Sequence, residues 1–137
     1  MTALVLIDTG PLVAIFLRTE QHHEICVEQL RTVKPPLLTC WPVITEAAWL
    51  LRRSRTAIQQ LLGAFNSGLL RLLSLEQDAV PWIAAFLHKY RSLGPDLADA
   101  ALVYLAERDG IDTVFTLDRR DFSVYRLAGN RRLELLP

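Results

Sequence analysis

Four acidic side chains in this sequence have types and positions that suit metal-assisted hydrolysis: Asp8, Glu46, Asp99 and Asp118. Carboxylates that converge raise one another's pKa values unless a cation compensates their charge. Hard oxygen ligands select Mg²⁺ or Mn²⁺. Such an ion orients a water molecule, lowers its pKa and neutralises charge on a scissile phosphate. We therefore expect these four acids to form one metal site.

The first and the last of these acids follow apolar runs that are typical of buried strands. Asp8 directly follows Leu4–Ile7, and Asp118 follows Thr113–Thr116. Ligands of open parallel sheets bind beyond the carboxyl ends of the strands, where the direction of the connections switches. Two neighbouring strands at that point would place Asp8 opposite Asp118. Capping of a following helix or turn is the structural alternative for both acids.

Glu46 lies inside an apolar helical segment, WPVITEAAWLLRR, which starts at Trp41. No face of this helix is clearly polar before Arg52, so we expect Glu46 to lie on a covered surface or to line a cleft. A buried carboxylate is costly unless it meets a cation or a hydrogen-bond donor, or stays protonated. An ion pair with an arginine is the structural alternative.

Asp96 and Asp99 are three residues apart in PDLADAALVYLAERDG and project from one side of the first helical turn. Asp96 is a good N-cap, and Asp99 complements the helix dipole. Beyond Asp99 the helix has almost no polar face until Glu107, which indicates a buried helix with Asp99 at its entrance. We predict a functional role for Asp99, whereas capping and a supporting role stay equally open for Asp96. The other supporting candidates are two hydroxyl residues, Thr9 and Thr116.

Short apolar runs alternate with helical segments along the chain. The expected strands are Leu4–Ile7, Pro36–Thr39, Leu69–Leu73, Thr113–Thr116 and Leu133–Leu136. The expected helices are Pro11–Leu17, Gln21–Thr32, Trp41–Arg52, Thr56–Asn66, Gln77–Tyr90 and Leu97–Asp109. Near-continuous apolar strands are typical of a parallel sheet that is covered on both faces. We therefore predict an α/β fold of one domain, residues 1–137, with three α/β/α layers around a central, mostly parallel sheet of about five strands.

The composition indicates which binding partners and which cellular compartment to expect. The formal net charge is zero and the pI is near 6.8, so the chain lacks a general basic surface for nucleic acid. Local features must bind any such partner, and 13 of the 15 basic residues are arginines, whose forks suit phosphates. Cys26 and Cys40 lie in apolar surroundings, as is typical of buried thiols in a reducing cytoplasm. Because Asp8 and Pro11 interrupt the apolar N-terminus, we predict a cytoplasmic protein without a membrane span.

Four blocks, in this order, resemble the PIN domain: LIDTGPLVA, TEAAWLL, DLADAALVYLAE and TLDRRDFSVYR. More narrowly, they are similar to the VapC toxin nucleases of bacterial type II toxin–antitoxin pairs. The resemblance spans about residues 4–136. It implies a PIN-like three-layer fold and an endoribonuclease that hydrolyses RNA phosphodiester bonds with Mg²⁺ or Mn²⁺.

The resemblance also implies roles for single residues. The family's four catalytic acids fall on Asp8, Glu46, Asp99 and Asp118. Asp8 and Asp99 would be the main metal ligands, and Glu46 and Asp118 would complete the site directly or through water. Thr116 matches the polar residue that often precedes the fourth acid. Asp96 falls where relatives often carry a small polar residue or another acid.

Arginines flank the expected site on two sides. Those that follow the helix of the second acid are Arg52, Arg53 and Arg55, and those that follow the fourth acid are Arg119 and Arg120. We hypothesise that Arg52, Arg53, Arg119 and Arg120 hold the phosphate backbone of RNA. Solvated arginines at helix ends are the alternative.

The family further implies a homodimer and a small antitoxin partner. The apolar helix around Trp41 and Trp49 would suit a partner surface, and core packing explains these tryptophans equally well. A receiver-like phosphotransfer domain also collects acids at strand ends, but it needs a lysine after a late strand, and Lys34 and Lys89 lie elsewhere. The remaining rival is a catalytically silent PIN-like module that binds RNA or protein. Such modules usually lack one or more of the acids, and all four are present here.

Overall fold

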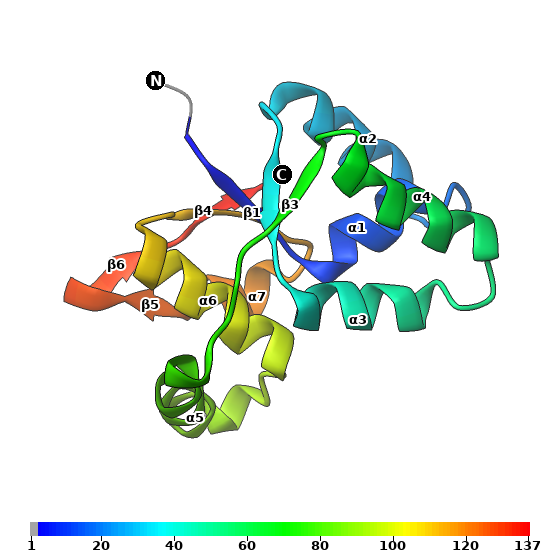
Figure 1. Cartoon of the computed structure of the whole chain (residues 1–137). Helices are drawn as coiled ribbons and strands as arrows, with labels where there is room; N and C mark the ends of the chain where they lie inside the picture. The colour runs from blue at the N-terminus through cyan, green and yellow to red at the C-terminus, as the bar shows by residue number, and fades with distance from the viewer. Residues whose placement is uncertain (1–2) are drawn as a thin grey trace.

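A five-stranded sheet forms the centre of the computed structural model, which describes residues 3–137 (Figure 1). Its strands are β1 (Val5–Ile7), β2 (Leu37–Thr39), β3 (Leu70–Leu72), β4 (Thr113–Phe115) and β7 (Glu134–Leu136). Their order is β3-β2-β1-β4-β7, and every neighbouring pair is parallel. All residues of β1, β2 and β4 are buried, which explains why their apolar runs do not alternate. The predicted parallel sheet of five strands is confirmed.

Helices cover the sheet on both faces. One side carries α1 (Thr9–Phe16), α2 (His23–Thr32), α3 (Trp41–Leu50) and α4 (Arg55–Asn66), and the other carries α5 (Val80–Lys89) and α6 (Leu97–Asp109) (Figure 1). The chain moves outward from β1 to β2 and β3 and then returns past β1 to β4. Because parallel crossovers are right-handed, this reversal moves the connecting helices to the opposite face. The predicted three-layer α/β/α arrangement is confirmed.

The elements that the sequence pattern did not predict are all short. A four-residue helix, α7 (Arg119–Phe122), follows β4, and β5 (Arg126–Leu127) pairs with β6 (Arg131–Arg132) in an antiparallel ribbon. Gly129 turns this ribbon with a φ of 74°, a conformation that costs glycine little. Segments of two to four residues carry too little periodicity to be recognised in a sequence.

Four predicted helices differ at their starts. Helix α1 begins at Thr9 instead of Pro11, and α4 begins at Arg55 instead of Thr56. The helix expected over Gln21–Thr32 begins at His23, and the one expected over Gln77–Tyr90 divides into a 3₁₀ turn, Gln77–Ala79, and α5. Such shifts are common because the first turn of a helix depends on its cap.

Helix α6 has buried residues along most of its length. Its buried residues are Ala98, Ala100, Ala101, Leu102, Val103, Leu105 and Ala106. Asp96 caps its start, and Gly110, with a φ of 67°, ends it. The first turn of α6 lies at the edge of the sheet where the strands end, because Asp96 and Asp99 line one cleft with Asp8 and Asp118. Helix α6 also contacts α3.

Cys26 and Cys40 are both buried and free, as predicted. Along residues 3–137 no helix combines the length and the apolarity that crossing a membrane requires.

Candidate active site

The candidate site lies where the connections of the sheet change direction, between β1 and β4. These strands are direct neighbours, and the backbone N–H of Asp8 donates to the carbonyl of Phe115 at 2.9 Å. A cleft of about 560 Å³ opens beyond their carboxyl ends. The residues that line it are Asp8, Thr9, Gly10, Glu46, Leu50, Gly94, Asp96, Asp99, Leu117, Asp118 and Asp121. All four predicted acids and two of the three supporting residues thus line one cleft.

The carboxylate of Asp8 is held by a residue at the end of the neighbouring strand and does not cap α1. It occupies the position before α1, but its side chain makes no capping hydrogen bond. Instead its Oδ2 accepts a hydrogen bond from the Thr116 hydroxyl at 2.9 Å. Only 7 % of Asp8 is exposed, and this burial raises the pKa of its carboxyl to about 6. The capping alternative does not account for this carboxylate.

Thr116 connects the first acid to the fourth. Its hydroxyl oxygen donates to Asp8 and accepts from the backbone N–H of Asp118 at 3.0 Å. Asp118 also caps α7, because its Oδ1 accepts from the backbone N–H of Asp121 at 3.2 Å. Burial raises the pKa of Asp118. Asp118 therefore lines the cleft and caps a helix at the same time.

Among the residues that the structure describes, Glu46 has no arginine partner. Within residues 3–137 the ion pairs are Arg31–Glu28, Arg108–Asp109 and Arg131–Glu107, all away from the cleft. Burial is the largest cause that raises the pKa of Glu46, and the neighbouring carboxyl of Asp96 raises it further. The Thr9 hydroxyl lowers it. The ion-pair alternative is wrong, and the expectation that Glu46 lines a cleft is confirmed.

Thr9 lies between the first two acids. Its hydroxyl donates to the carbonyl of Val43 at 3.5 Å, which joins the start of α1 to α3, the helix that carries Glu46. Thr9 is almost fully buried. Thr9 therefore lies beside the site, as predicted, and its hydrogen bond holds α1 against α3.

Asp96 and Asp99 lie at the entrance of α6, as their spacing predicted. The Oδ1 atom of Asp96 accepts from the backbone N–H of Asp99 at 2.9 Å, so the capping role of Asp96 is present. Asp99 is buried more deeply and accepts a hydrogen bond at Oδ2 from the Tyr125 hydroxyl at 2.9 Å. Burial, followed by the charges of Asp8 and Asp96, raises the pKa of Asp99 to about 8.

Sequence reasoning missed two residues of the site. Asp121 lines the cleft three residues after Asp118, so its spacing on one turn of α7 could have indicated it. Tyr125 contacts Asp99 across 26 residues of chain and carries no sequence signal.

The donor set of the cleft fits a divalent cation. No lysine or arginine belongs to its lining among the described residues, and the pKa values of Asp8, Glu46, Asp99 and Asp118 are all raised. A hard cation relieves such repulsion and prefers carboxylate oxygen. Across residues 3–137, however, no group of three or more His, Cys, Asp or Glu side chains stands arranged to hold a metal ion. The carboxylates therefore share a cleft without forming a closed ligand shell.

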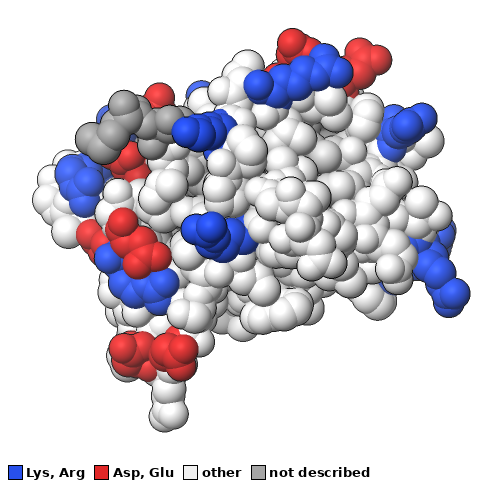
Figure 2. Space-filling model, turned by 45° about the horizontal axis from the view of Figure 1, so that its top comes forward, with Lys and Arg blue, Asp and Glu red and all other residues white. Residues whose placement is uncertain are grey.

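The four predicted RNA-binding arginines lie in different surroundings. Arg52 lies over the ring of Trp49, with 3.9 Å from its Cζ to the centroid, and Arg119 donates to the carbonyl of Pro137. The charge of Arg120 lowers the pKa of Asp118, so it lies near the acids. Arg53 is exposed. On the face in Figure 2, basic side chains are spread over several separate places, and those at the left and the top lie beside acidic side chains.

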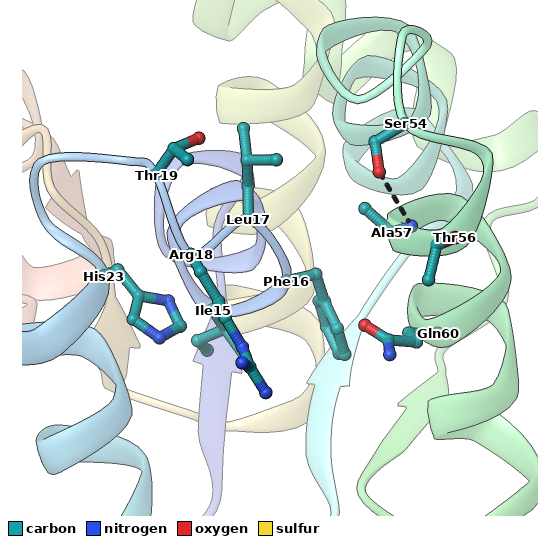
Figure 3. A pocket seen from close by; sticks show the side chains of 10 residues that line it. All are labelled: Ile15, Phe16, Leu17, Arg18, Thr19, His23, Ser54, Thr56, Ala57 and Gln60. Atoms are coloured by element: carbon teal, nitrogen blue, oxygen red, sulfur yellow. Dashed lines mark hydrogen bonds between the residues drawn. The ribbon is translucent and has the colours of Figure 1, made fainter.

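A second hollow, of about 630 Å³, lies between α1, α2 and α4 and contains no acid (Figure 3). The Ser54 hydroxyl accepts from the backbone N–H of Ala57, where it caps α4, and the Nδ1 atom of His23 contacts the carbonyl of Ala14 at 2.6 Å. Phe16 points into the hollow between α1 and α4. Arg18, Thr19, Thr56 and Gln60 also line this hollow, but its described lining has no carboxylate that could hold a cation.

The tryptophans of α3 lie on the surface. Trp41 and Trp49 are each 62 % exposed, and Leu50 beside them is 52 % exposed. Core packing is therefore the wrong explanation for these two tryptophans. Eight residues turn an α-helix by about 800°, so Trp41 and Trp49 project about 80° apart around the axis of α3 and lie about two turns apart along it.

Comparisons with known proteins agree with this fold. Residues 5–128 match the sequence model of the PIN-domain family. Ribonuclease VapC26 of Mycobacterium tuberculosis is 31 % identical over 134 residues, which cover 96 % of this chain and 99 % of that protein.

Solved structures with low sequence identity share the fold. The Mycobacterium tuberculosis toxin VapC20, described as cleaving the sarcin–ricin loop, matches with a TM-score of 0.76 and 17 % identity over 85 % of this chain and 91 % of its own. A toxin–antitoxin complex from Klebsiella pneumoniae matches with a TM-score of 0.70 and 15 % identity over 98 % and 97 % of the two chains. VapBC2 from Rickettsia felis, bound to a fragment of its promoter DNA, matches with a TM-score of 0.64 and 14 % identity over 98 % and 99 %.

Proposed function

The chain belongs to the PIN-domain family and, within it, to the VapC-like ribonucleases, and on that premise we propose that it is a metal-dependent endoribonuclease. It would hydrolyse phosphodiester bonds of RNA at the acidic cleft, with Mg²⁺ or Mn²⁺. The observation that carries the proposal is the gathering of four carboxylates with raised pKa values in one cleft whose described lining has no basic residue.

Asp8 and Asp99 are the main candidates to hold the cation, because they are the most deeply buried of the four acids. Glu46 and Asp118 complete the set, directly or through water. When bound, the cation would supply a water of lowered pKa and would neutralise charge on the scissile phosphate. The Thr116 hydroxyl donates to one carboxylate oxygen of Asp8 and accepts from the backbone N–H of Asp118. These two hydrogen bonds hold the two acids at a fixed distance from each other.

Phosphate contacts from Arg52, Arg53, Arg119 and Arg120 remain part of the proposal. The position of Arg120 near Asp118 supports its contact best, since RNA at the cleft would pass this side chain. The guanidinium of Arg119, in contrast, has to leave the carbonyl of Pro137 before it can bind phosphate.

We further propose two protein partners. One is a small antitoxin, supported by the likeness to chains solved as toxin–antitoxin complexes. The other is a second copy of this chain, supported by the exposed Trp41, Trp49 and Leu50 on α3. Exposed tryptophans are costly in water, and a symmetric dimer would cover the same surface on both copies.

The nuclease is tested by incubating the purified protein with a labelled structured RNA in Mg²⁺, in Mn²⁺ and in EDTA. Asp8→Asn and Asp99→Asn should each reduce metal-dependent cleavage by about a hundredfold or more, because each removes a charged ligand. Asp112→Asn is the matched control, since this exposed acid lies on the chain just before β4 and does not line the cleft.

A binding assay in EDTA belongs to the same experiment. Arg120→Glu should weaken RNA binding and reduce its dependence on salt. If the wild-type protein binds RNA but cuts no RNA with either metal, the nuclease proposal fails and a catalytically silent PIN-like binding module takes its place.

A further inference from the structure

Tyr125 is fully buried beneath the candidate site, between α7 and β5. Three aromatic rings surround its own ring, with centroids 4.9 Å away at Phe86, 5.0 Å at Tyr90 and 5.1 Å at Phe122. These neighbours come from α5, from the end of α5 and from α7. Packing on three sides leaves the ring little freedom, so the place of its hydroxyl is determined by the core.

The hydroxyl of Tyr125 donates to Oδ2 of Asp99 at 2.9 Å. The last torsion of an aspartate side chain has a broad energy minimum, so the carboxylate turns easily unless a partner holds it. Burial, and after it the charge of Asp99, raises the pKa of Tyr125, so its hydroxyl stays a neutral donor at working pH. We propose that Tyr125 is a positioning residue, which holds the Asp99 carboxylate in the orientation that receives the divalent cation; this inference rests on the proposed nuclease function.

Tyr125 also joins the two elements that carry the third and the fourth acid. Its backbone N–H donates to the carbonyl of Asp121 at 3.2 Å, and its ring contacts Phe122, both in α7. Asp118 caps that same helix. The side chain of Tyr125 thus reaches the entrance of α6, while its backbone is hydrogen-bonded to α7, so one residue connects the two helices whose starts carry Asp99 and Asp118.

In metal sites generally, a second residue forms a hydrogen bond to each metal-binding side chain and fixes the orientation of that side chain. Tyr125 has this relation to Asp99. Loss of such a partner typically weakens metal binding by about 10-fold to 100-fold. With Oδ2 engaged by Tyr125, Asp99 offers Oδ1 to a ligand in the cleft. Without the hydroxyl, the charge of Asp99 stays and only its orientation is released.

The test compares Tyr125→Phe with Tyr90→Phe. Both variants keep an aromatic ring in the same cluster and lose one hydroxyl, but the Tyr90 hydroxyl accepts from the backbone N–H of Arg126 at 3.0 Å and does not touch an acid. Thermal unfolding in EDTA establishes that both variants are folded. Mn²⁺ binding to the protein alone is then titrated by electron paramagnetic resonance of the free ion, without RNA.

We expect Tyr125→Phe to raise the Kd for Mn²⁺ by about tenfold or more and Tyr90→Phe to leave it unchanged. In the cleavage assay, Tyr125→Phe should need more Mn²⁺ for half-maximal rate, while saturating Mn²⁺ restores most of kcat and the KM for RNA stays the same. Loss of packing alone would not be rescued by Mn²⁺.

Equal Mn²⁺ affinities of Tyr125→Phe and the wild type would overturn the positioning role and leave the proposed nuclease intact. A wild-type protein that binds no Mn²⁺ would instead overturn the metal-dependent nuclease, and the inference with it. The same titration therefore separates the two failures.

Discussion

At the scale of single residues, the carboxyl groups of the site are costly to ionise, first because they are buried and then because other acids lie close. The carboxyl groups of Asp8 and Asp99 are buried near other acids, and their pKa values rise to about 6 and about 8. Both groups therefore carry protons in the folded protein at pH values where they are ionised in the unfolded chain. The folded state loses stability when these protons leave, and a bound cation would restore it.

The raised pKa values predict that the metal-free protein becomes less stable as the pH rises. The pKa of Asp99 is raised above its unfolded value, so its contribution to stability is complete below about pH 4 and is lost as the pH rises through 8. Between pH 7 and pH 9, Tm in EDTA should fall by roughly 3 °C, which corresponds to about 1 kcal/mol. Thermal unfolding followed by circular dichroism measures this change.

Asp99→Asn should remove most of that fall, because the amide does not ionise, and Asp112→Asn should keep it. Mg²⁺ should raise Tm more at pH 9 than at pH 6, since protons then compete less for the carboxylates. An Asp99→Asn variant that follows the wild-type curve would show that the ionisation of Asp99 does not limit stability.

At the scale of elements, two helices begin with acids that also line the cleft. Asp96 caps α6, and Asp118 caps α7. Both helices start close to the carboxyl ends of the strands, where the cleft opens. A helix start has unsatisfied backbone N–H groups, so an acid at this place satisfies them and still contributes charge to the cleft.

The two roles of Asp96 can be separated because serine caps a helix without adding charge. Asp96→Ser should keep Tm within about 2 °C and retain most of the nuclease activity, because Asp96 is exposed and its Oδ1 is engaged by the backbone. Asp96→Ala should lose about 1 kcal/mol of stability. Chemical unfolding and the cleavage assay, run on the same samples, provide both numbers.

If Asp96→Ser is as stable as the wild type but cuts RNA a hundredfold more slowly, Asp96 is a member of the metal site and not merely a cap. The comparison with Asp96→Ala ensures that a loss of activity is not caused by a frayed α6.

At the scale of the whole molecule, charge and apolar surface are distributed differently. In Figure 2 the acidic side chains lie at the left and the top of the face and the basic ones are spread more widely, whereas α3 exposes three large apolar side chains, Trp41, Trp49 and Leu50. Leu50 also lines the acidic cleft, so the apolar surface of α3 reaches the site. A second copy bound there would lie next to the cleft and would limit how RNA approaches it.

Trp49→Glu should therefore convert a dimer to a monomer, because a charge cannot be buried without a partner at low cost. Sedimentation velocity over a range of concentrations measures the change. Val80→Glu is the matched control, since Val80 is 59 % exposed on α5, away from α3. Wild-type protein that sediments as a monomer at all concentrations would contradict the proposed dimer.

The sequence by itself determined the layers of this protein and the acids of its cleft. Burial of β1 and β4 on both faces appears as continuous apolar runs, and the acids that end such strands must meet at one edge of a parallel sheet. The spacing of Asp96 and Asp99 places them on one helical turn. All of these signals are local, with periods of a few residues, so a single chain displays them without its fold.

Only the tertiary structure decided between alternatives that have the same local pattern. An apolar helix with tryptophans can face the core or the solvent, and Trp41 and Trp49 face the solvent. The contacts that hold the acids join residues far apart in the chain: Thr116 reaches Asp8 across 108 residues, and Tyr125 reaches Asp99 across 26. Such pairs form because separate elements pack together, and the packing depends on the shape of every side chain between them.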